Sequence, residues 1–97
     1  MSIQSQALRL VAHTTSLLEG ILSASNAIRP SIAQRKANPE LAAARDRIDA
    51  LIVAARAWYD AAGDFLLSAD GTTDEIDRAR DAEQSAARAY REIEQGL

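Results

Sequence analysis

The sequence predicts an all-α fold, an antiparallel three-helix bundle that forms a single helical domain over residues 1–97. Apolar residues recur at helical intervals, and no alternation of apolar and polar residues is long enough for a strand. Alanine, which favours helix and adds little buried area, supplies nearly half of the apolar residues. A chain of 97 residues is expected to form one domain around one core.

The first helix is expected over about residues 3–28. Its main apolar stripe steps along one face at helical spacing and consists of Ile3, Leu10, Leu17, Ile21 and Ile28. Arg29-Pro30 then ends or kinks the helix, because proline lacks the amide proton and restricts the residue before it. For residues 31–37 the periodicity does not decide between a short further helix and an irregular connection.

The second helix is expected over about residues 39–69. Asn38-Pro39-Glu40 is a strong start, since asparagine caps helices, proline suits the first helical position and a carboxylate favours the positive end of the helix dipole. Asp70-Gly71 should end this helix, with Gly71 in the left-handed conformation that often follows a helix.

The third helix is expected over about residues 73–95. Thr72 and Glu75 have the spacing of a capping box, in which each side chain accepts a hydrogen bond from the other residue's backbone amide. Short connections favour antiparallel neighbours, so the three helices should run up, down and up.

The stretch AARAWYDAAGDFLL holds three of the four aromatic residues, Trp58, Tyr59 and Phe65. Large apolar residues at helical spacing are usually buried, so we expect all three in the core of the bundle. In an antiparallel arrangement the turn at Gly71 brings Trp58 near Ala82 and Ala86 of the third helix, where large side chains face small ones.

Composition disfavours several classes of function. The net charge of −3 argues against nucleic-acid binding, and no apolar run reaches the ~18 residues of a membrane span or forms a Sec-type signal. His13, the only histidine, falls on the polar side of the first helix, where we expect it in solvent. No catalytic, cofactor-binding or metal-binding constellation is present in the sequence, so we expect a protein that is not an enzyme and needs no cofactor.

Two groups of residues predict an interaction surface. The first helix carries a second apolar stripe that one-sided packing does not require, and the second helix carries two apolar residues among acids. The predicted surface comprises Leu8, Val11, Leu18, Leu22, Val53, Asp60, Asp64 and Leu67. The stripe predicts that the chain self-associates or binds a helical partner through the first helix, with a homodimer as the economical outcome. The alternative is that residues 31–37 fold back and cover it in a monomer.

These observations predict a non-enzymatic helical module that binds other proteins, an adaptor or inhibitor of a larger bacterial or phage-targeted complex. Arginine far outnumbers lysine and alanine is abundant, which is typical of GC-rich bacteria and their phages. The expected location is the cytoplasm of a bacterial or phage-infected cell.

A second reading comes from Tyr90-Arg-Glu-Ile-Glu94. This segment resembles the Tyr-x-x-x-Asp/Glu secretion signal of the WXG100 and PE families of type VII secretion substrates. The resemblance covers five residues and implies a small helical partner protein that is secreted without a Sec signal. The Trp-x-Gly turn that defines WXG100 proteins is absent.

Overall fold

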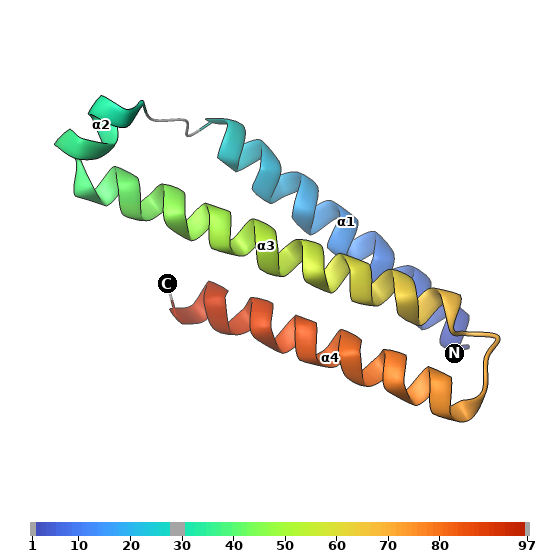
Figure 1. The fold of residues 1–97 in the computed structure, drawn as a ribbon. Helices are drawn as coiled ribbons and strands as arrows, with labels where there is room; N and C mark the ends of the chain where they lie inside the picture. Colours follow the sequence, from blue (N-terminus) through green and yellow to red (C-terminus); the bar gives the residue numbers. More distant parts are fainter. Residues whose placement is uncertain (1, 28–30, 97) are drawn as a thin grey trace.

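The computed structural model describes residues 2–27 and 31–96, apart from the side chains of Ile32 and Arg35. Three long helices, α1 (Ile3–Ala27), α3 (Pro39–Leu67) and α4 (Thr73–Gly96), and a short α2 (Ile32–Ala37) follow one another along the chain. The long helices lie roughly along the 54 Å axis of the molecule and run up, down and up (Figure 1). The predicted all-α three-helix bundle is therefore confirmed.

Residues 31–37 form a helical turn that the periodicity left undecided. Ser31 and Gln34 form a capping box: the Ser31 hydroxyl accepts from the Gln34 amide at 3.2 Å, and the Gln34 side chain accepts from the Ser31 amide at 2.8 Å. Each otherwise free amide is thereby satisfied, which explains why so short a helix begins here. The Ser-x-x-Gln spacing was the sequence signal for it.

The start of α3 follows the prediction, whereas its end uses a different device. The Asn38 carboxamide oxygen accepts from the amides of Glu40 and Leu41 at 3.1 and 3.2 Å. The helix ends at Leu67 rather than near residue 69, and Gly71 does not adopt the left-handed conformation that the sequence suggested. A β-carbon at Gly71 would meet the end of the exposed Glu75 side chain, which is free to move aside.

The interface between α1 and α3 is lined by small residues. The most buried residues of α1 are Ala7, Thr14 and Ser25, and they face a side of α3 that includes the fully buried Ala55. The Thr14 hydroxyl donates to the Leu10 carbonyl at 2.8 Å, so its burial leaves no free donor. The large residues of α1 flank this line and are only partly covered, because a close approach of two helices leaves room for small side chains alone.

One polar clamp ties the end of α1 to α3. Arg45 Nη1 donates to the Ser25 carbonyl oxygen at 2.9 Å and to Ser25 Oγ at 2.6 Å, while Arg45 Nε lies 3.3 Å from Asp49 Oδ1. The last turn of α1 has no basic residue of its own. The cation that favours the negative end of this helix therefore comes from α3.

The interface between α3 and α4 buries the large aromatic rings. Trp58, Phe65 and Tyr90 are all buried, and the Trp58 and Tyr90 ring centroids lie 5.7 Å apart. The Trp58 indole N–H donates to Glu83 Oε1 at 2.8 Å inside this core.

The predicted contacts of Trp58 were half right. The register of α3 and α4 is close to the prediction, but α4 is rotated so that Glu83 and Ala87 face the ring. Ala82 is exposed, whereas Ala86 does pack at the edge of the core. The hydrogen bond to the indole explains the rotation, since a buried N–H needs an acceptor and Glu83 supplies one.

Candidate interaction surfaces

The exposed large apolar side chains lie on α1 and α3. Within the described residues they are Leu8 (50% exposed), Leu22 (36%), Val53 (71%), Tyr59 (38%) and Leu67 (84%). Four of these five belong to the predicted interaction surface. Tyr59 was expected in the core with Trp58 and Phe65, and that expectation was wrong. One residue beyond Trp58 along α3, Tyr59 is turned by about 100° and points to the outer side of the α1–α3 interface.

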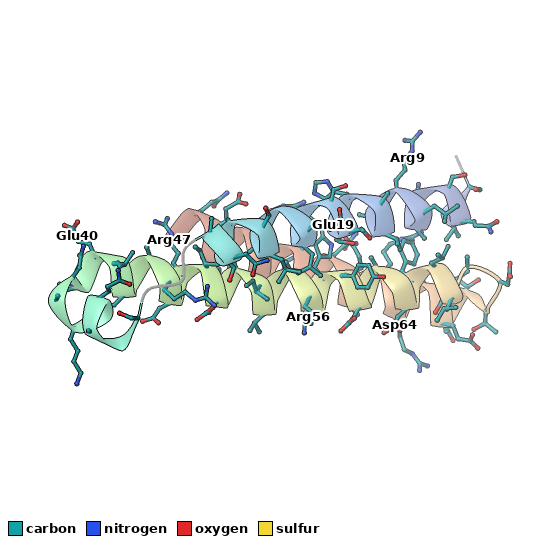
Figure 2. All side chains as sticks on the ribbon, turned by 90° about the horizontal axis from the view of Figure 1, so that it is seen from above. Arg9, Glu19, Glu40, Arg47, Arg56 and Asp64 are labelled. Carbon is teal, nitrogen blue, oxygen red and sulfur yellow. The ribbon has the colours of Figure 1, made fainter. Side chains whose placement is uncertain are left out.

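A shallow hollow of about 430 Å³ lies at this outer side. Val11 of α1 and Tyr59, Gly63, Leu66 and Leu67 of α3 give it an apolar lining, and Asp60 and Asp64 complete it. Figure 2 shows Asp64 on the side of α3 away from α1, and Asp60 lies one helical turn earlier on the same helix face, so the two acids form the outer margin of the hollow. We refer to Leu8, Val11, Leu22, Tyr59, Leu66 and Leu67 together as the seam patch.

The structure brings together only part of the predicted surface. Val11, Asp60, Asp64 and Leu67 line one hollow. Leu18 is half-buried and packs against the core cluster, so it is less available than predicted. Val53 is exposed but lies about 120° around α3 from Tyr59, because six residues separate them on the helix.

The short helix α2 leaves the stripe of α1 open. It packs against α3 and not against α1 within the described residues. The alternative in which residues 31–37 fold back over Leu8 and Leu22 is therefore not the arrangement seen here.

A second surface, which the sequence analysis missed, lies between α1 and α4. Both helices pack along α3, yet no Cα atom of α1 lies within 8 Å of one in α4 over the described residues. Two adjoining hollows of about 440 and 330 Å³ fill this space and share Leu10, Glu83 and Gln84 in their linings.

Arginine side chains surround this second surface. Arg88 and Arg91 line the larger hollow, and Arg9 and Arg80 line the smaller. The Arg80 guanidinium carbon lies 5.6 Å from the Phe65 ring centroid, and that of Arg91 lies 5.8 Å from the Trp58 ring centroid. The sequence signal for this surface was the helical spacing of residues 80, 84, 87, 88 and 91.

His13 is exposed, as expected, yet it is not free of the core. Its ring meets that of Trp58 edge to face at a centroid distance of 5.4 Å. Trp58 thereby contacts both α1 and α4. Among the described residues, His13 forms no hydrogen bond with a serine or threonine hydroxyl that it could activate as a nucleophile.

Tyr90 shows the strongest electrostatic perturbation among the described residues. Burial raises the pKa of Tyr90 to about 12, and a hydrogen bond to Glu94 together with its negative charge acts in the same direction. Both residues belong to the Tyr-x-x-x-Glu segment noted above, and the tyrosine of that segment is buried in the core.

Two other kinds of site are absent from the described residues. No three His, Asp or Glu side chains gather where they would hold a metal ion. No helix in this part of the chain combines the length and apolar character needed to cross a membrane. Comparison of the chain with protein-family models, curated proteins and solved structures finds no match.

Proposed function

We propose that this protein is a non-enzymatic interaction module, an adaptor or inhibitor that binds a larger bacterial or phage-targeted complex. The observation that supports this proposal is the exposure of Tyr59 and Leu67 in the lining of one apolar hollow, with Leu8 exposed about one helical turn from the lining residue Val11. Clustered exposed apolar side chains with a polar margin are typical of surfaces that bind other proteins.

The seam patch has the composition of such a surface. Fully burying one large apolar side chain contributes ~1.5–3 kcal/mol, so covering several half-exposed ones can offset part of the entropy lost on association. Asp60 and Asp64 at the margin would orient a partner, because rim charges affect specificity and encounter rate more than affinity.

The stripe on α1 also has a symmetry that favours a homodimer. Leu8 and Leu22 lie at equal distances along the chain from Thr15. An antiparallel pair of α1 helices related by a two-fold axis at Thr15 therefore sets Leu8 of one copy against Leu22 of the other. The Thr15 hydroxyl already donates to the Val11 carbonyl at 2.7 Å, so it needs no polar partner at that axis.

Sedimentation velocity tests the homodimer directly. We expect wild-type protein to form dimers at micromolar concentration and Leu8→Glu/Leu22→Glu to give folded monomers. Ser16→Glu/Ser23→Glu is the matched control, since it adds the same charge to exposed positions that lie about 60–120° around α1 from Leu8 and Leu22. A monomeric wild type, or a control that dissociates as readily, would rule out the α1 dimer.

A further inference from the structure

The space between α1 and α4 has the chemistry of a second docking site. We call it the arginine groove and define it by Leu10, Phe65, Arg80, Glu83, Arg88 and Arg91. We propose that the arginine groove binds an acidic amphipathic helix of a partner protein, which packs between α1 and α4 as a fourth long helix. This proposal does not depend on the seam patch, which lies on the other side of α1.

The shape of the groove suits a helix. Its walls, α1 and α4, run in the same direction along α3 (Figure 1) and stay more than 8 Å apart between Cα atoms over the described residues. The two hollows follow each other along α4 from Arg80 to Arg91, about three helical turns or roughly 16 Å. Three turns of an amphipathic helix laid in a groove is a common mode of recognition.

The lining provides an apolar contact for one face of such a helix. The half-buried Leu10 contributes aliphatic surface, whereas the buried Ala87 and Phe65 form the bottom of the larger and the smaller hollow. Arg80 and Arg91 lie with their guanidinium groups near the Phe65 and Trp58 rings, which keeps their long stems along the groove.

The charge of the groove favours an acidic partner. Arg88 and Arg91 make no ion pair within 4.0 Å among the described residues, and Arg80 has only a long contact of 3.7 Å to Asp77. Glu83, the one acid in the lining, is buried and accepts the Trp58 indole hydrogen bond. Because the whole chain carries a net charge of −3, this basic surface is a local feature.

Arg9 can add to this charge from the opposite wall. Its side chain lines the smaller hollow, and its guanidinium group extends away from α3 into solvent (Figure 2). An arginine has enough rotamer freedom to turn toward a carboxylate on a bound helix. A helix in the groove would then meet guanidinium groups from both α1 and α4.

Binding can be measured with two synthetic helices of about 18 residues, roughly 27 Å long. Both carry leucine on one face; one has glutamate beside that face, and the other has lysine at the same positions. The only tryptophan, Trp58, contacts Arg91 and reports binding through its fluorescence. We expect saturable binding of the acidic helix that weakens with added salt, and none of the basic helix.

Arg88→Glu tests the site, because Arg88 is exposed and, unlike Arg80 and Arg91, lies over no aromatic ring of the described residues. We expect about tenfold weaker binding of the acidic helix, since one attraction becomes a repulsion. Arg56→Glu is the matched control, for it reverses an exposed arginine on the side of α3 away from α1 (Figure 2) and should leave binding unchanged. If the charge reversal disturbs the fold, Arg88→Gln can be used in its place. We expect it to weaken binding of the acidic helix about threefold.

Three results would overturn the proposal. The first is no binding of the acidic helix at concentrations up to about 1 mM, the weakest affinity that such a site would need. The second is an equal loss of binding in Arg56→Glu and Arg88→Glu. The third is self-association of the wild type that Arg88→Glu abolishes, which would assign the groove to a second copy of this chain. Dissociation by Leu8→Glu/Leu22→Glu bears on the seam patch alone.

Discussion

The two faces of α3 pack in opposite ways. Toward α4, α3 buries Trp58 and Phe65 against a helix whose inner residues include Glu83 and Ala87. Toward α1, the buried line on the partner helix consists of Ala7, Thr14 and Ser25. The first face fills its interface with large rings, whereas the second fills it with small side chains.

This difference explains why the exposed apolar surface is concentrated beside α1. When small residues form the contact line, the helices approach closely and the larger residues on either side are held at the margins. Leu8 and Leu22 therefore remain exposed although α1 is rich in apolar residues. The α4 helix has fewer large apolar residues, yet the described part of it leaves none of them exposed to a comparable degree.

The largest expected effect comes from removing the ring that joins the three long helices. Trp58→Ala should lower the free energy of unfolding by ~3–5 kcal/mol, because it opens a cavity and leaves the buried Glu83 carboxylate without its donor. Urea unfolding followed by circular dichroism measures the loss. Tyr59→Ala is the control and should cost ~1 kcal/mol or less, since that ring is partly exposed.

Equal losses for Trp58→Ala and Tyr59→Ala would contradict the assignment of one ring to the core and the other to the surface. The two residues are adjacent and chemically similar, so local helix propensity affects them alike.

Alkaline pH should weaken the same interface. The pKa of Tyr90 is raised to about 12 in the folded protein from 10.0. The folded state therefore favours the protonated phenol. Its contribution to stability is complete below pH 10 and is lost as the pH rises from 10 to 12, by about 2–3 kcal/mol in all.

Urea unfolding at pH 9 and above pH 11 measures this contribution. Tyr90→Phe keeps the ring and removes the ionisable group, so its stability should change much less over the same interval. A wild type and a Tyr90→Phe variant with parallel pH profiles would show that Tyr90 does not cause the loss.

The helices and their starts were predictable because local chemistry decides them. Asn38-Pro39 and the apolar periodicity act within a few residues, and the structure follows both. The rotation of α4 was not predictable in the same way. It depends on a hydrogen bond between Trp58 and Glu83, residues that are 25 positions apart in the chain.

The two candidate surfaces also differ in whether the sequence alone predicts them. The exposure of Leu8 and Leu22 follows from an apolar arc on α1 that is too wide for one-sided packing, which the sequence displays directly. The arginine groove depends on the separation between α1 and α4, which only their packing on α3 determines. Surface charges on one helix do not reveal whether another helix covers them.

A third prediction tests the close approach of α1 and α3. Ala7→Leu should destabilise the fold by ~1–3 kcal/mol, because Ala7 has no exposed surface and the helices must separate to admit a larger side chain. Ala12→Leu adds the same atoms at an exposed position of the same helix and should be nearly neutral. Thermal unfolding of both variants compares them, and a neutral Ala7→Leu would mean that the interface is loose.

The smallest effect on folding is expected at Leu67, the most exposed large apolar residue of the described chain, at 84%. Leu67→Ser should change the free energy of unfolding by no more than ~0.5 kcal/mol when the protein is dilute, because only a small part of the leucine surface is buried within the folded chain. Unfolding measured at several protein concentrations makes this test sharper. If the seam patch joins two copies, the stability of the wild type rises with concentration by mass action, and the difference from Leu67→Ser grows with it. A difference that is large at every concentration would instead show that Leu67 is covered within one chain, and it would remove that residue from the seam patch.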